Sequence, residues 1–134
     1  MLVQPSTTHL AQGALANEAY RRVIATTPQM QLVLMTLKAR GTIPGPFLKN
    51  GVPYEKHPET SQFIRVEAGR ARLVIYKHRG RHAQSILCAG QSVLIPAGVL
   101  HFVANASSSQ RLHLSTIYSP PEHAPNLVQF SQPP

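Results

Sequence analysis

Four side chains that can bind a metal ion fall on short apolar segments of this sequence. Glu55 and His57 lie two positions apart in "YEKHP", Gln62 begins "QFIRV", and His101 lies in "LHFVAN". Side chains alternate between the two faces of a β-strand, so Glu55 and His57 would share one face. A carboxylate and an imidazole placed in this way can bind one ion together, which predicts a metal site.

The same alternation predicts that the other two candidates point into the protein. Gln62 shares a face with Ile64, whereas Arg65 takes the opposite face, where its charge is most easily hydrated. His101 shares a face with Val103. Three strands would therefore each contribute an inward group that can act as a ligand.

Two imidazoles, one carboxylate and one amide oxygen form a mixed nitrogen and oxygen donor set. Such a set suits Fe(II), Mn, Ni, Co or Zn and leaves coordination positions open. We therefore expect one divalent metal ion per chain. Simpler interpretations stay open: His101 as a satisfied core histidine, Glu55 as a rim carboxylate in an ion pair, and Gln62 as an amide bonded to backbone.

Tyr76 and Cys88 are two further residues with chemical potential. Tyr76 is a candidate substrate-binding residue, because a tyrosine in a barrel can hold a substrate or act as an acid; packing is the alternative. Cys88 is the one cysteine and ends an apolar segment, so a buried, inert thiol is expected. A single cysteine excludes an internal disulfide and favours a reducing, cytoplasmic compartment.

The elements that would position these side chains are short strands separated by turn residues. Glycines in "EAGRA" and "HRGRH" mark hairpin turns, and no long amphipathic helix is predicted. The pattern predicts an all-β sandwich or barrel and excludes a nucleotide-binding α/β fold, which needs alternating helices. The expected strands span residues 21–26, 30–38, 52–57, 61–68, 71–77, 82–88, 91–95, 100–105 and 110–118.

Length and charge limit the architecture and the partners. A chain of 134 residues fits one domain, with an irregular N-terminal arm over 1–20, a barrel over 21–125 and a tail over 126–134. The net charge is +8, and six basic residues between Arg65 and Arg81 are expected to be solvated on a hairpin. Neither a nucleic-acid recognition motif nor a membrane-spanning segment is found, so neither partner is expected.

One set of spaced residues resembles the second sequence motif of the cupin superfamily. That motif has Gly, five residues, Pro, one residue, Gly, two residues, His, three residues and Asn. Gly90, Pro96, Gly98, His101 and Asn105 match every spacing.

The first cupin motif is matched with two changes. Glu55 stands where the family usually has His, and Gln62 stands where it usually has Glu, while His57 and Gly69 agree with the motif. The exchange keeps one carboxylate and replaces an imidazole by a weaker amide donor. A Pro/Gly-rich insertion over residues 41–54 precedes these positions, either as a lid over the barrel mouth or as a tolerated surface loop.

The resemblance, closest to small cupins labelled "mannose-6-phosphate isomerase-like", covers residues 20–125. It implies a jelly-roll β-barrel (a double-stranded β-helix), a divalent metal held by Glu55, His57, Gln62 and His101, and a homodimer. The activity it implies is oxygenase or isomerase chemistry on a small oxygenated metabolite, including anionic ones. A non-catalytic small-molecule or sugar sensor is the alternative, and a shared fold does not decide between them.

Overall fold

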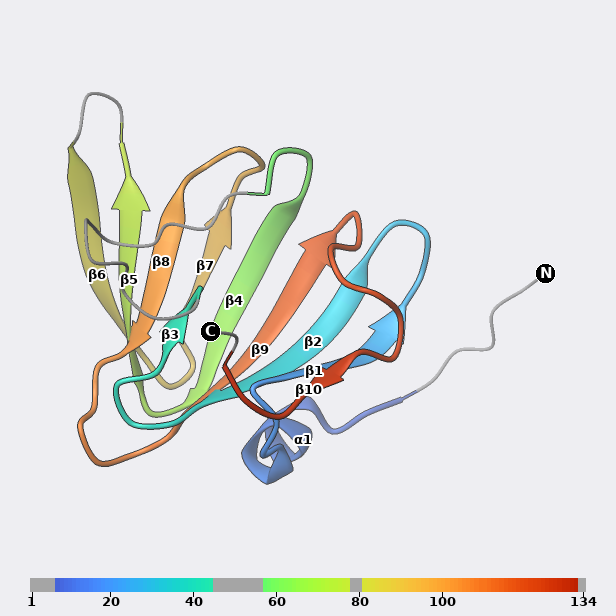
Figure 1. The fold of residues 1–134 in the computed structure, drawn as a ribbon, viewed down its shortest axis with the longest axis horizontal. Helices are drawn as coiled ribbons and strands as arrows, with labels where there is room; N and C mark the ends of the chain where they lie inside the picture. Colours follow the sequence, from blue (N-terminus) through green and yellow to red (C-terminus); the bar gives the residue numbers. More distant parts are fainter. Residues whose placement is uncertain (1–6, 45–56, 78–80, 133–134) are drawn as a thin grey trace.

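The computed structural model describes residues 7–44, 57–77 and 81–132, in which ten strands and one short helix form two antiparallel sheets (Figure 1). The larger sheet has the strand order β10-β1-β2-β9-β4-β7 and the smaller has the order β3-β8-β5-β6. The expected all-β fold of jelly-roll type is confirmed. The elements are α1 (Leu10–Ala16), β1 (Arg21–Thr26), β2 (Gln31–Leu37), β3 (Thr42–Ile43), β4 (Ser61–Ala68), β5 (Arg70–Tyr76), β6 (His82–Cys88), β7 (Ser92–Ile95), β8 (His101–Asn105), β9 (Leu112–Ser119) and β10 (Val128–Gln129).

The hydrophobic core lies between the two sheets and is built from alternate residues of their strands. Val33 of β2, Val66 of β4 and Leu114 of β9 come from the larger sheet, and Leu73 of β5 and Val103 of β8 come from the smaller. Each is at most 3% exposed. Burying one such side chain stabilises the fold by about 1.5–3 kcal/mol, so this alternation is what holds the sheets together.

The inner face of the larger sheet becomes polar at one end. Gln31 of β2, Tyr118 of β9 and Gln62 of β4 lie directly opposite one another across three adjacent strands. Opposite residues share a face, and all three side chains are buried, at 1% exposure or less. Aligned buried polar groups are costly unless they are satisfied, so this end of the fold is where a site is expected.

The described parts of the N-terminal arm and the C-terminal tail contain a short helix and a short strand. Residues 10–16 form α1, which packs on β9 and is anchored where the His113 Nδ1–H donates to the carbonyl of Ala14, at 2.9 Å. The tail contributes β10, which pairs with β1. Of the expected strand 52–57, residues 52–56 lie outside the described residues, and His57 is not in a strand.

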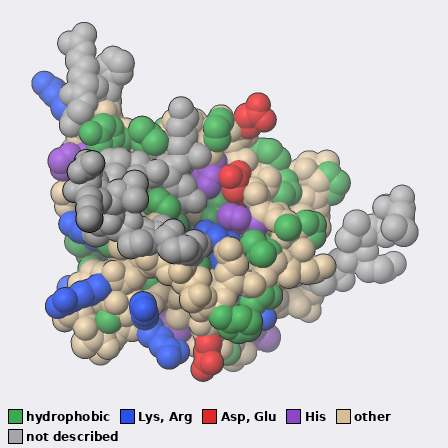
Figure 2. All heavy atoms as spheres, viewed as in Figure 1, with side chains coloured by type: hydrophobic (Ala, Val, Ile, Leu, Met, Phe, Trp, Pro, Cys, Tyr) green, Lys and Arg blue, Asp and Glu red, His purple; other side chains and the backbone are tan. Residues whose placement is uncertain are grey.

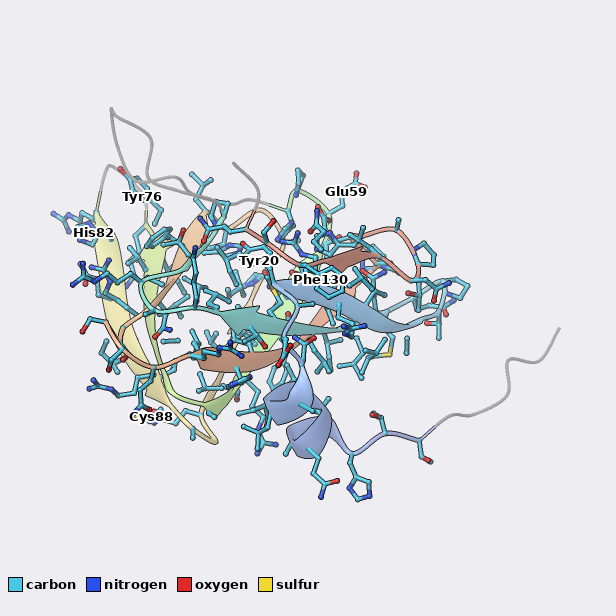
Figure 3. All side chains as sticks on the ribbon, turned by 60° about the horizontal axis from the view of Figure 1, so that its bottom comes forward. Tyr20, Glu59, Tyr76, His82, Cys88 and Phe130 are labelled. Carbon is cyan, nitrogen blue, oxygen red and sulfur yellow. The ribbon has the colours of Figure 1, made fainter. Side chains whose placement is uncertain are left out.

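The expectation of a buried Cys88 is wrong. The Cys88 side chain is exposed. It ends β6, which is the edge strand of the smaller sheet among the described strands, with β5 as its one neighbour there (Figure 3). Apolar neighbours in the sequence therefore did not predict its burial, because an edge position is a property of the sheet.

The surface of the described residues shows no single basic face in the view of Figure 2. Lys and Arg side chains lie there in separate small groups rather than in one continuous patch. Within the described ranges, no helix is both long and apolar enough to cross a bilayer.

Candidate functional site

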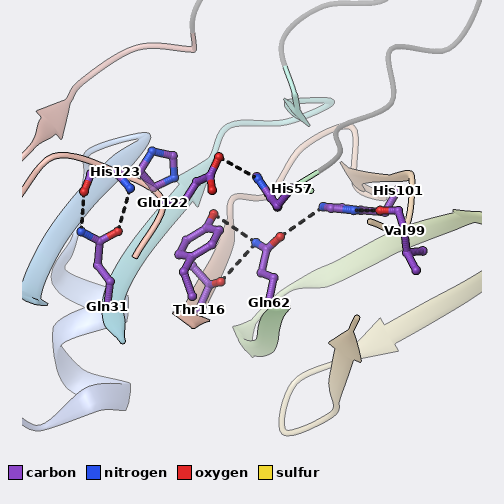
Figure 4. A network of polar contacts seen from close by, with 9 residues as sticks. Gln31, His57, Gln62, Val99, His101, Thr116, Glu122 and His123 are labelled. Carbon is purple, nitrogen blue, oxygen red and sulfur yellow. Dashed lines mark hydrogen bonds and ion pairs between the residues drawn. The ribbon is translucent and has the colours of Figure 1, made fainter. Parts of the chain in front are cut away.

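The amide of Gln62 is the centre of a buried network at the polar end of the sheets (Figure 4). Its Nε2 donates to Thr116 Oγ1 at 3.2 Å and to the Tyr118 hydroxyl at 3.1 Å, both on β9. Its Oε1 lies 3.1 Å from Nε2 of His101, which is on β8. Gln62 and His101 are each 1% exposed. The contact between them therefore joins the two sheets inside the protein.

The protonation of His101 follows from its second contact. Its Nδ1 lies 2.9 Å from the carbonyl oxygen of Val99. A carbonyl oxygen only accepts, so Nδ1 carries a proton, and in the neutral ring Nε2 then carries a lone pair. Gln62 Oε1 is also an acceptor. With this amide orientation His101 Nε2 faces Gln62 Oε1 at 3.1 Å, and a cation shared by the two atoms would satisfy both.

This pair fits the donor set of a divalent metal. An imidazole nitrogen and an amide oxygen are donor types that such an ion binds. His101 Nε2 and Gln62 Oε1 lie 3.1 Å apart, close enough to contact one ion.

His57 lies beside this pair and is 4% exposed. The centroid of its ring is 5.5 Å from that of His101 and 5.5 Å from that of Tyr118. Its backbone carbonyl accepts from the N–H of Gly98 at 2.8 Å. Gly98 has φ +81°, a conformation that glycine adopts most easily. The glycine turn before β8 therefore holds the chain that carries His57 next to the strand that carries His101.

Glu122 and His123 complete the network, and neither was among the site residues predicted from the sequence. Glu122 Oε1 lies 3.0 Å from His57 Nδ1, and the His123 ring packs edge-on against Tyr118 at 5.0 Å. Both residues follow β9, outside any strand, so that no alternation predicted where they point. The available signal was Gln31, a polar residue at the start of an apolar strand, which bonds to the backbone of His123.

The structure brings together three of the five candidate ligand and substrate-binding residues predicted from the sequence. His57, Gln62 and His101 are neighbours, whereas Glu55 lies outside the described residues. Tyr76 lies on the other face of the smaller sheet from His101, because Ile75 is directly opposite His101 and side chains alternate along β5. Among the described residues, no group of three or more His, Cys, Asp or Glu is arranged to hold a metal, and the donors that meet there are His57, His101 and the amide of Gln62.

Comparison with known proteins identifies the family to which this chain belongs. Residues 48–118 match the family model of the cupin domain. The uncharacterized protein L612 of Acanthamoeba polyphaga mimivirus is 36% identical over 93% of this chain and 71% of its own length. The uncharacterized protein YrkC of Bacillus subtilis is 26% identical over 90% of this chain, which spans 60% of YrkC.

Solved structures of other proteins are similar to this chain in fold. The crystal structure of BH2720 from Bacillus halodurans has a TM-score of 0.84 at 29% identity and covers 96% of this chain and 91% of its own. Oxalate decarboxylase of Bacillus subtilis, which has Mn(II) centres, has a TM-score of 0.57 at 17% identity, covering 77% of this chain and 24% of its own, and is similar in fold alone. On the family match over residues 48–118 and the similarity to L612, this chain belongs to the cupin family.

Proposed function

We propose that this protein is a metal-binding cupin that acts on a small oxygenated metabolite by oxygenase- or isomerase-type chemistry. The observation that supports it most is the convergence of His101 Nε2 and Gln62 Oε1, two acceptors 3.1 Å apart, beside His57. A further support is that a protein of the same fold, oxalate decarboxylase, has Mn(II) centres.

The residues that would hold the ion are His57, Gln62 and His101, with Glu55 as the carboxylate ligand. A bound divalent ion supplies Lewis-acid polarisation of substrate oxygens. The protein residues supply the positioning: Thr116 and Tyr118 accept from the Gln62 amide and so direct its oxygen toward His101. Because these side chains are buried, water is largely excluded and electrostatic interactions at the site are strengthened.

Two further parts of the proposal concern partners and location. A recognition helix or an aromatic-basic RNA-binding motif is not found in the sequence, so a nucleic-acid partner is not proposed. The single cysteine supports a reducing, cytoplasmic compartment. The proposed partners are therefore a small-molecule ligand and a second copy of this chain.

The test of the metal site is elemental analysis of untagged protein beside the double variant His57→Ala/His101→Ala. We expect close to one equivalent of a divalent metal in the wild type and none in the variant, with circular dichroism showing that both are folded. The matched control is His9→Ala/His82→Ala, which removes two exposed histidines and should keep the metal. Wild-type protein that takes up neither Fe(II), Mn(II), Ni(II) nor Zn(II) would contradict the proposal.

Turnover separates the enzyme from the sensor. Metal-loaded protein would be incubated with a panel of diketones and sugar phosphates, and consumption of a substrate would favour the enzyme. Saturable binding of a panel member without consumption would favour the non-catalytic alternative.

A further inference from the structure

The carboxylate of Glu122 meets the ring of His57 at the edge of the site. Glu122 Oε1 and His57 Nδ1 are 3.0 Å apart (Figure 4). The imidazole is 4% exposed and the carboxylate side chain is 32% exposed, so the contact links a buried ring to a group that solvent reaches.

The position of Glu122 is held by the residue that follows it. The side-chain amide of Gln31 donates to the His123 carbonyl at 2.7 Å, and its oxygen accepts from the His123 N–H at 3.0 Å. Both backbone groups of His123 are thus bonded to one buried side chain, while its ring packs on Tyr118. His123 is therefore fixed to β2 by hydrogen bonds and to β9 by ring packing. Because Glu122 directly precedes it, these contacts also hold Glu122 beside His57.

We propose that Glu122 is the positioning residue for His57. The contact is an ion-pair distance rather than an aligned hydrogen bond, and a carboxylate oxygen 3.0 Å from Nδ1 favours the ring with the proton on that nitrogen, because a bare nitrogen would present its lone pair to the negative charge. In the neutral ring the lone pair is then on Nε2, on the same imidazole that lies against His101 and Tyr118. A carboxylate behind a ligating histidine fixes its tautomer and orientation and raises its basicity as a ligand.

This inference rests on the proposed metal site but names a group outside the four predicted ligands. Glu122 also lines an open depression of about 420 Å³, together with Pro58, Glu59, Thr60, Pro120 and Pro121. Glu59 is exposed and lines the same depression, which makes it a matched control for the loss of one carboxylate at this surface.

The first test is the tautomer of His57 in metal-free protein, measured by two-bond ¹H–¹⁵N correlation spectroscopy with His57→Gln for assignment. We expect a protonated Nδ1 in the wild type and in Glu59→Ala. Glu122→Ala should show a mixture of the two tautomers, whereas Glu122→Gln should keep the Nδ1 proton, because its amide oxygen can still accept. A bare Nδ1 in the wild type, or an unchanged ring in Glu122→Ala, would overturn the inference.

The second test is calorimetric titration with Mn(II). Glu122→Ala should weaken binding about 10- to 100-fold, as loss of a partner behind a histidine ligand does, while Glu59→Ala should bind like the wild type. Equal weakening in both variants would mean a general charge effect and would contradict the positioning role. Failure of the proposed function and failure of this inference can be told apart. Wild-type protein that binds no metal contradicts the proposed function. The tautomer of His57, measured in metal-free protein, decides the role of Glu122 independently.

Discussion

The amide of Gln62 contacts side chains on two other strands, and its chemistry differs from that of the carboxylate usual in cupins. It donates twice, to Thr116 and Tyr118, and presents its oxygen to His101. An amide can make these three contacts at once, whereas a carboxylate only accepts. Gln62 therefore holds a neutral oxygen in place, at the expense of the charge that a glutamate would add.

Substitutions at Gln62 test whether its neutral amide oxygen is a metal ligand and how it compares with a charged carboxylate oxygen. We expect Gln62→Glu to bind Mn(II) at least about tenfold more tightly than wild type, about 1.4 kcal/mol, because a charged oxygen is the stronger ligand. Gln62→Leu should weaken binding by at least a similar factor, because it removes the donor oxygen. Calorimetric titration measures both, and Gln84→Glu, at an exposed glutamine, controls for added surface charge. Equal affinities in Gln62→Glu, Gln62→Leu and wild type would exclude Gln62 as a ligand.

At the scale of elements, the glycine turn from β4 to β5 has less room than the glycine turn from β6 to β7. Gly69 has φ +92°, and a Cβ added there would lie 2.8 Å from the carbonyl oxygen of Arg111. Gly90, between β6 and β7, has a similar φ of +87°, but a Cβ there would meet no atom within 4 Å. Both positions therefore have a positive φ, but only at Gly69 would an added Cβ also collide with backbone.

Alanine at these two glycines should separate conformational strain from a clash. Gly90→Ala should reduce the free energy of unfolding by about 1–2 kcal/mol, because alanine disfavours a positive φ. Gly69→Ala should lose a further amount of about 1–3 kcal/mol, because the added methyl group has to displace backbone. Urea unfolding followed by circular dichroism measures both losses. A loss at Gly90 as large as that at Gly69 would show that the clash is relieved at little cost.

At the scale of the whole molecule, the outer face of the larger sheet carries an apolar row. Leu94, Phe63, Ile117 and Leu32 lie opposite one another on β7, β4, β9 and β2. Leu94 is 66% exposed. A continuous apolar row of this kind is typical of a surface that another protein covers. We propose it as the face through which two copies of the chain would form the expected homodimer.

Light scattering coupled to size exclusion gives the mass of the particle in solution. We expect twice the mass of one chain for the wild type and a shift toward one chain for Leu94→Glu, because the dimer would bury that charge. Ile86→Glu is the control, since Ile86 is 51% exposed but lies on β6 in the other sheet. A monomeric wild type, or a dimer that is insensitive to Leu94→Glu, would contradict the proposed face.

The sequence alone determined eight of the ten described strands and the inward direction of two site residues. Gln62 and His101 were predicted to point inward, and both are 1% exposed. These features were accessible because alternation along a strand is a local property of the backbone, with a period of two residues. The spacing from Gly90 to Asn105 was likewise enough to predict the family.

Only the tertiary structure decided which side chains meet. The register of β5 against β8 directs Tyr76 away from His101, and the edge position of β6 exposes Cys88. Glu122 and His123 reach the site because the chain after β9 is bonded to Gln31 on another strand. Such contacts join residues far apart in the chain, so they depend on sheet order and register, which no local periodicity encodes.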